Sequence, residues 1–308
     1  MKLNHESLKN AAQWQQLGVK VPAFDRDAML AATEENPVWV HFGAGNIFRG
    51  FIAVLQQRLL EMGLEKSGII AAETFDFDII DKIYAPYDSL TMNVTLRADG
   101  STDKEIVASL ATGLKAGTAF AEDWAELKAA FVKESLQMAS FTITEKGYAL
   151  RDMSGNLMQI VKNDMAAGPE DPHHAMACVA SLMYARYQAG AFPIALVSMD
   201  NCSHNGEKLR QAVLEVAQAW CEAKLVPAEF VAYLSDEKQV SFPWSMIDKI
   251  TPRPAEVITE QLEKLGVEDM GAVITSRNTY IAPFVNAEAP QYLVVEDRFP
   301  NGRPALEK

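Results

Sequence analysis

The chain has 308 residues, 49% hydrophobic and 22% charged, which is the profile of a globular protein with a sizeable core. Its formal net charge of −13 argues against nucleic acid and acidic membrane surfaces as partners. The chain begins without a secretion-signal pattern, no apolar run reaches the ~18 residues of a membrane span, and the three cysteines have no CxxC spacing, so we expect a cytoplasmic protein. The five histidines form no HExxH motif and no zinc spacing with cysteine, so we expect no metal site.

The first regular elements follow an N-terminal extension. Residues 1–37 contain an amphipathic segment, a Val-Pro turn and a short helix expected at 26–33. A strongly apolar run at 38–42 predicts a buried strand. The apolar spacing over 48–61 predicts a helix that packs on a sheet. The sequence therefore predicts strand, turn and helix in close succession.

The turn between this strand and this helix reads Gly43-Ala44-Gly45. Gly43 can take a backbone angle that a side chain would forbid, and Gly45 lets the backbone approach a pyrophosphate, toward which the first amides of the helix point. The third glycine of the dinucleotide fingerprint would fall at Phe48, whereas Gly50 stands two positions later, so the match is partial. An ordinary strand–helix turn is the alternative interpretation.

An acidic cluster follows the second predicted strand, at residues 67–73. The strand ends in Glu73, with Asp76 and Asp78 close behind. In the dinucleotide fold an acid in this place hydrogen-bonds the adenosine ribose, and it would also repel a 2′-phosphate, which favours NAD over NADP. The alternative is that these acids cap the helix predicted at 78–84, where negative charge is favourable.

Strands and helices alternate through the rest of the chain. Further strands are predicted at 90–96, 106–110, 140–144, 192–198 and 292–297, and further helices at 121–133, 175–189 and 206–221. Residues 242–252 are interpreted as a packed loop. The alternation predicts an α/β fold, with a mostly parallel sheet and helices on both faces. Polar clusters at 43–49, 144–148 and 200–205 follow strands, so we expect them to meet in one cleft at the carboxyl edge of the sheet.

Five motifs in the expected order resemble the polyol-specific long-chain dehydrogenases, a family that includes mannitol 2-dehydrogenase and mannonate oxidoreductase (fructuronate reductase). The matching stretches are HFGAGNIFR at 41–49, TEKGY at 144–148, SMDNCSHNG at 198–206, MIDKITP at 246–252, and Pro283-Phe284 with YLVVED at 292–297. Because they are spread over nearly the whole chain, these motifs are a specific signal.

The resemblance implies a Rossmann-type NAD-binding domain, placed at residues 1–285, followed by the start of a mainly helical substrate domain at 286–308. It also implies NAD(P)-dependent, metal-independent interconversion of a secondary alcohol and a ketone on an open-chain sugar derivative. The family's catalytic lysine stands in a Lys-x4-Asn-x2-His pattern that does not occur in this sequence. We therefore expect a chain cut off at the start of its second domain, no turnover by the 308 residues alone, and self-association through the surface left exposed.

The resemblance assigns roles to particular residues. Asn201 matches the asparagine that hydrogen-bonds the substrate oxygen and supports the developing alkoxide, and Asp248 matches the acid beside the site. Lys146 is typical of uronate-reducing members and suits a substrate carboxylate, with a solvated lysine as the alternative. His204 and Asn205 are assigned to substrate binding. The cofactor-binding assignments are Phe42, Gly43, Ala44, Gly45, Asn46, Ile47, Arg49, Glu73, Asp76, Asp78, Thr144 and Glu145.

The reaction predicted from this resemblance is hydride transfer between NAD and a sugar acid of the mannonate type, which gives its keto form. A dehydrogenase of mannitol or another polyol is the alternative for the substrate. A non-catalytic NAD-binding module is the alternative without turnover. The expected partners are therefore small molecules, namely NAD and a sugar acid or polyol.

Overall fold

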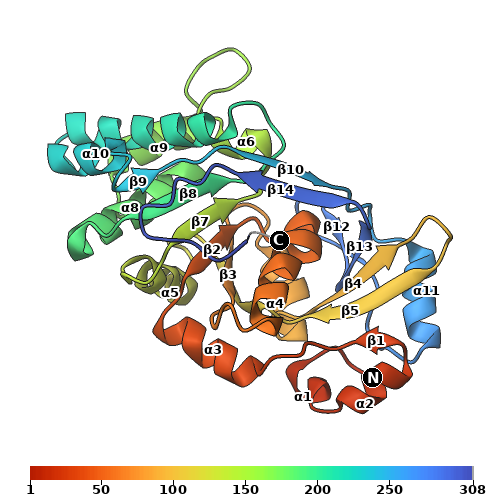
Figure 1. Cartoon of the computed structure of the whole chain (residues 1–308). Helices are drawn as coiled ribbons and strands as arrows, with labels where there is room; N and C mark the ends of the chain where they lie inside the picture. Colours follow the sequence, from red (N-terminus) through yellow and green to blue (C-terminus); the bar gives the residue numbers. More distant parts are fainter. Residues whose placement is uncertain (307–308) are drawn as a thin grey trace.

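The computed structural model describes residues 1–306 and contains a six-stranded sheet (Figure 1). In spatial order its strands are β6 (Leu110–Lys115), β3 (Ile69–Glu73), β2 (Trp39–Phe42), β7 (Met138–Phe141), β8 (Ile194–Ser198) and β9 (Val240–Ser241). Every neighbouring pair is parallel, and the strand order reverses between β2 and β7, which is the doubly wound arrangement. The predicted mostly parallel sheet is therefore confirmed.

Helices cover both faces of this sheet, as predicted. Val40 and Phe42 belong to a core shared with helices of one face, whereas Trp39 belongs to the core of the other face. The first group of helices is α5 (Ala121–Phe131), α8 (Ala175–Gly190), α9 (Asn205–Glu222) and α10 (Ala228–Ser235), and the second is η1 (Phe48–Ile52), α4 (Ala53–Glu61) and η2 (Ile80–Tyr84). Since successive strand residues point to opposite faces, a continuous apolar run such as β2 supplies both cores.

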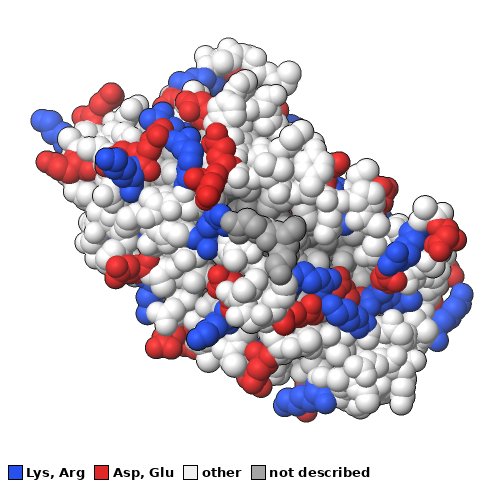
Figure 2. All heavy atoms as spheres, in the orientation of Figure 1, with Lys and Arg blue, Asp and Glu red and all other residues white. Residues whose placement is uncertain are grey.

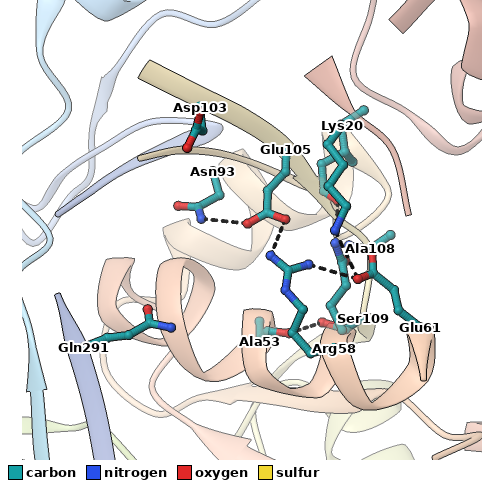
Figure 3. Close-up of polar contacts among 12 residues, drawn as sticks. Lys20, Ala53, Arg58, Glu61, Asn93, Asp103, Glu105, Ala108, Ser109 and Gln291 are labelled. Carbon is teal, nitrogen blue, oxygen red and sulfur yellow. Dashed lines mark hydrogen bonds and ion pairs between the residues drawn. The ribbon is translucent and has the colours of Figure 1, made fainter. Parts of the chain in front are cut away.

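A second, four-stranded sheet lies on the other side of α4 (Figure 1). Its order is β1 (Val19–Lys20), β5 (Thr102–Val107), β4 (Thr91–Leu96) and β13 (Phe284–Glu288), with only β4 and β5 antiparallel. Figure 3 shows how α4 is joined to this sheet, with Arg58 donating to Glu105 on β5. The helix that follows the glycine turn is thus held between the two sheets.

The prediction of a single strand at 106–110 is wrong. The structure ends β5 at Val107 and begins β6 at Leu110, so that the chain changes sheets at Ala108 and Ser109. Two hydrogen bonds join this turn to α4. Gln57 Oε1 accepts from the Ala108 amide at 2.7 Å. Ser109 Oγ donates to the Ala53 carbonyl at 2.6 Å (Figure 3). An apolar run cannot reveal a change of sheet, because both sides of the change are buried.

The packed loop predicted at 242–252 is also wrong, because it contains a strand. β10 (Ser245–Lys249) pairs antiparallel with β14 (Gln291–Val295) to form a two-stranded ribbon. Ile247 is buried, whereas Met246 is 58% exposed and its cross-strand partner Val294 is 61% exposed. The alternation is short, and its partner strand lies far along the chain, so local pattern alone did not identify it.

The remaining elements are short or peripheral. They are α1 (His5–Leu8), α2 (Ala11–Gln16), α3 (Arg26–Glu35), η3 (Ala85–Tyr87), α6 (Thr144–Tyr148), α7 (Gln159–Ala167), α11 (Glu256–Lys264), β11 (Val273–Ile274) and β12 (Tyr280–Ile281). Within residues 1–306 no helix has both the length and the apolar character needed to cross a membrane. The boundary expected at residue 285 falls inside β13, and β14 is attached to β10, so the division into two domains stays a prediction.

Candidate functional site

The glycine turn joins the end of β2 to η1 at the point where the strand order reverses. Gly43 has a φ of +106°, and a Cβ there would lie 2.2 Å from the carbonyl oxygen of Thr142, at the end of β7. Gly43 is therefore required by the packing of the two strand ends. A Cβ on Gly45, by contrast, would meet no atom within 4 Å, so the backbone of the turn can be approached from that side.

His41 holds the end of β2 against the end of β7. Its ring is fully buried, with Nδ1 2.6 Å from Ser140 Oγ and Nε2 2.8 Å from Thr142 Oγ1. The ring also stacks on Phe48, with centroids 4.0 Å apart. Burial lowers the pKa of His41 well below its usual range, so the imidazole is neutral at physiological pH. No role was predicted for this histidine from the sequence, and here it positions the turn.

Arg49 is fully buried behind the turn. Its Nη2 donates to Asn46 Oδ1 at 2.8 Å, and Nη1 donates to the carbonyl of Ala282 at 3.0 Å. Burial lowers its pKa to about 10, so it stays protonated at neutral pH. Among residues 1–306 it forms no ion pair with a carboxylate, and its Nε has no hydrogen-bond partner. The turn therefore has an uncompensated positive charge directly behind it.

The three acids after β3 all have internal partners. Glu73 Oε2 accepts from the Ala44 amide at 2.9 Å, and its Oε1 accepts from the amides of residues 74–76. Burial raises the pKa of Glu73, although these four amides favour its charged form. Asp76 accepts from Thr275 Oγ1 at 2.7 Å, and Asp78 accepts from the Ser276 amide at 2.8 Å. The acids thus join the turn, the end of β3 and a distant hairpin.

Asp78 is the acid best placed to meet a ligand, since its side chain is 27% exposed while Glu73 and Asp76 are buried. It also pairs with Lys82 one helical turn later, at 2.9 Å. That pair fits the helix-capping alternative in part. The ribose role of the three acids stays a prediction.

The end of β7 is clamped by Asp200, from the end of β8. The amides of Ile143 and Thr144 each donate to its carboxylate at 3.0 Å, and the Tyr148 hydroxyl donates at 2.6 Å. Burial raises the pKa of Asp200. No individual role was predicted for Asp200, although its place directly after an apolar strand was a usable signal. This clamp fixes the short helix α6, which carries Lys146.

Two of the residues predicted on this helix differ in their surroundings. Glu145 forms an ion pair with Lys208 on α9. Lys146 is exposed and has no hydrogen-bond or ion-pair partner among the residues described. It is therefore free to meet a solute anion at the carboxyl edge of the sheet.

The predicted substrate residues after β8 separate into two kinds. Asn205 is buried, and its side-chain amide bridges to Ser245 on β10, accepting from the Ser245 amide at 3.1 Å and donating to its carbonyl at 2.9 Å. These bonds leave Asn205 a structural role. Asn201 and His204 are exposed, and the His204 ring meets the edge of Trp244 at 4.8 Å between centroids.

Asp248 lies on the outer face of the β10–β14 ribbon, opposite Tyr292 in the ladder. We call this outer face the ribbon face; its large apolar members, each between 42% and 61% exposed, are Trp244, Met246, Ile250, Tyr292 and Val294. Figure 2 shows largely uncharged surface where β10 and β14 lie in Figure 1, and charges of both signs interspersed elsewhere on this side.

Contacts between neighbouring strand ends join the three polar clusters along one edge of the sheet, whereas the single cleft expected there stays a prediction. Gly43 packs against Thr142, just after β7, and the next two amides of that loop donate to Asp200. Asn205 donates to the carbonyls of Asp200 and Ser245, which links the loop after β8 to β10. Among residues 1–306 no group of three His, Cys, Asp or Glu side chains is arranged to hold a metal ion. The arrangement offers an approachable backbone turn backed by a positive charge, with polar side chains at the neighbouring strand ends.

Comparison with known proteins shows the family to which the sequence is similar. A model of the mannitol dehydrogenase Rossmann domain matches residues 38–308. D-mannonate oxidoreductase of Thermotoga maritima is 52% identical over 307 residues, which is 100% of this chain and 56% of that protein. Polyol:NADP oxidoreductase of Gluconobacter oxydans is 30% identical over 303 residues, 94% of this chain and 55% of that protein. The chain thus spans about half the length of the curated relatives it matches.

Solved structures agree with the fold. Pseudomonas fluorescens mannitol 2-dehydrogenase, in a ternary complex with NAD and D-mannitol, superposes with a TM-score of 0.78 at 26% identity, over 99% of this chain and 56% of that one. Substrate-free D-sorbitol dehydrogenase gives the same TM-score and identity, over 99% of this chain and 57% of that one.

Proposed function

Because this chain belongs to the mannitol dehydrogenase family through its Rossmann domain, we propose that its residues hold the NAD site of an oxidoreductase that interconverts a mannonate-type sugar acid and its keto form. The observation that carries the proposal is the turn from Gly43 to Asn46, which is approachable at Gly45 and backed by the uncompensated Arg49. A pyrophosphate fits such a turn because backbone amides and a positive charge both favour an anion.

The residues of the turn fit a dinucleotide and divide its binding among them. The open side of Gly45 admits the phosphates, and Glu73 holds the Ala44 amide in place. Bound NAD would supply the hydride acceptor for the carbon that bears the substrate hydroxyl. The chain's own part is to bind and orient, and Asn201 is the exposed amide assigned to the substrate oxygen.

A sugar acid is favoured over a neutral polyol by Lys146. This lysine is exposed, has no partner among residues 1–306, and stands on a helix that is hydrogen-bonded to Asp200. A lysine at this edge suits a substrate carboxylate, which mannitol lacks. The 52% identity to a D-mannonate oxidoreductase supports the same choice. Mannitol remains the second candidate, supported by the structural neighbour solved with D-mannitol and NAD.

Calorimetric titration with NAD tests the cofactor site. The wild-type protein should bind NAD more tightly than NADP, and Gly45→Ala should weaken NAD binding at least tenfold, about 1.4 kcal/mol. Gly271→Ala is the matched control, because a Cβ there also meets no atom within 4 Å but lies away from the turn. Equal NAD affinity in wild type and Gly45→Ala would remove the turn from the cofactor site.

Binding of mannonate to the NADH complex tests the substrate class. Lys146→Ala should weaken mannonate binding by about 1–3 kcal/mol, the range for a lost charged hydrogen bond. It should leave D-mannitol binding unchanged. Lys162→Ala, at another exposed lysine, is the control. Mannonate affinity that does not respond to Lys146 would favour the neutral polyol.

A further inference from the structure

Two segments that are about 200 residues apart in the sequence meet just beyond the end of β3. The hairpin of β11 and β12 reaches this place with its loop, in which Thr275 Oγ1 donates to Asp76 Oδ2 at 2.7 Å. Both partners are buried. The same Thr275 oxygen accepts from the amide of Thr279 at 3.0 Å, and the Ser276 amide donates to Asp78. The loop is therefore held in a fixed position against the β3 end.

An aromatic ring and a guanidinium lie on the outer side of this junction. Phe75 is 63% exposed, and the guanidinium carbon of Arg277 lies 4.7 Å from the centre of its ring. Arg277 is exposed, and it forms no ion pair with a carboxylate among the described residues. The Phe75 backbone is fixed by its amide, which donates to Glu73 Oε1 at 2.9 Å. An exposed aromatic ring on a rigid backbone, covered only by an unpaired cation, is a suitable platform for a planar group.

The doubly wound fold indicates which planar group would arrive here. A dinucleotide in this fold places its pyrophosphate on the first glycine turn and its adenosine ribose at the end of the second strand. In this chain the second strand is β3, which ends at Glu73, two residues before Phe75. Guanidinium planes and aromatic rings both stack well on purine bases. The base is thus the part of the cofactor that suits this place.

We propose that Phe75 and Arg277 form the adenine end of the dinucleotide site, with the base stacked on the guanidinium–ring pair. The proposal rests on the proposed NAD site and deepens it, because it assigns the hairpin at 273–281 to cofactor recognition. Asp76 and Asp78 then act as positioning residues that hold this hairpin at the end of β3, in addition to any contact with the ribose.

The test compares the binding of NAD, ADP-ribose and nicotinamide mononucleotide by calorimetry. Phe75→Ala and Arg277→Ala should each weaken NAD and ADP-ribose by roughly 5- to 100-fold, the range for a lost base-stacking contact. Neither should change the binding of nicotinamide mononucleotide, which lacks the base. Phe75→Trp should retain the wild-type affinity. Arg253→Ala is the control, because its guanidinium lies 5.9 Å from the ring of Tyr280 in the same hairpin.

Three results would overturn the proposal. If wild type binds NAD and the Phe75 and Arg277 variants bind it equally well, the adenine assignment fails while the cofactor site at the turn stands. If Arg277→Ala weakens NADP but not NAD, the guanidinium meets a 2′-phosphate and not the base. If the wild-type protein binds neither NAD nor ADP-ribose, the proposed function fails as well. Unchanged melting temperatures, expected for two exposed side chains, show that the variants are folded.

Discussion

The helix that follows the glycine turn carries an arginine near each end, and the surroundings of the two are opposite. Within the described part of the chain, Arg49, at the turn, donates to neutral oxygens and to no carboxylate, and burial lowers its pKa to about 10. Arg58, at the far end, donates to Glu61 at 3.1 Å and to Glu105 at 2.6 Å (Figure 3). Burial opposes the Arg58 charge, but the two carboxylates outweigh it and its pKa is raised. At the helix end beside the second sheet, the positive charge of Arg58 is thus balanced by two carboxylates.

This difference matches the proposed function, in which one end of the helix is structural and the other binds the cofactor. At the Arg58 end each charge has its counter-charge, since Lys20 also pairs with Glu61 and Asn93 donates to Glu105 (Figure 3). At the Arg49 end a buried cation has no carboxylate partner among residues 1–306, which costs free energy unless another interaction compensates it. A phosphate group on the turn would supply the missing negative charge. The contrast therefore supports the turn as the anion site of the fold.

The largest effect is expected at Gly43, where the turn is closed against β7. Gly43→Ala should destabilise the protein by at least ~3 kcal/mol, because a Cβ would lie 2.2 Å from the Thr142 oxygen at a φ of +106°. Gly45→Ala should change stability by less than ~1 kcal/mol. Urea unfolding of both variants measures this. Equal losses at the two glycines would mean that the turn is not open at Gly45.

At the paired end of the helix, Arg58→Met should lower stability by about 1–2 kcal/mol. It removes one partner from Glu61 and Glu105, which keep Lys20 and Asn93, and the partial exposure of Arg58 reduces the loss. NAD affinity should be unchanged. Urea unfolding and calorimetry of the same preparation check both halves. A variant with weakened NAD binding would show that the two ends of the helix are coupled.

At the unpaired end, Arg49→Met should have the reverse profile. Loss of the charge behind the turn should weaken NAD binding by roughly tenfold, about 1.4 kcal/mol. Stability should fall less than in Arg58→Met, because the removed charge had no carboxylate and its desolvation cost is also removed. NAD titration at two salt concentrations is the measurement. If Arg49→Met binds NAD with wild-type affinity but has a lower free energy of unfolding, the role of the arginine is only structural.

The smallest effect concerns pH and the neutral His41. Its folded pKa lies well below the usual 6.5, so below that pH the unfolded chain binds a proton that the folded protein does not. Protonation of His41 in the unfolded chain does not affect the free energy of unfolding above pH ~7.5. It lowers this free energy by about 1 kcal/mol between pH 7.5 and pH 5.5. His41→Gln should remove this part of the pH dependence. The check is the difference in unfolding free energy between the two pH values in both proteins; equal slopes would contradict the assignment.

The sequence by itself was sufficient for the strand–turn–helix at residues 38–61, the parallel sheet and the family. Each of these features depends on residues that are close together in the sequence. Apolar runs indicate buried strands, Gly43 and Gly45 indicate the turn, and five motifs indicate the family. The carboxyl ends of parallel strands share one edge, so even the meeting of the three polar clusters followed from local pattern.

Only the tertiary structure decided what the polar residues at that edge do. Asn205 binds Ser245 and is structural, Arg49 lies behind the turn, and Asp76 holds a hairpin 199 residues away. The sequence motifs assigned these residues to the site, but their partners come from segments whose register no local pattern specifies. The exposure of Lys146, Asn201 and Arg277 was decided in the same way, because a side chain is free only when no distant segment has already satisfied it.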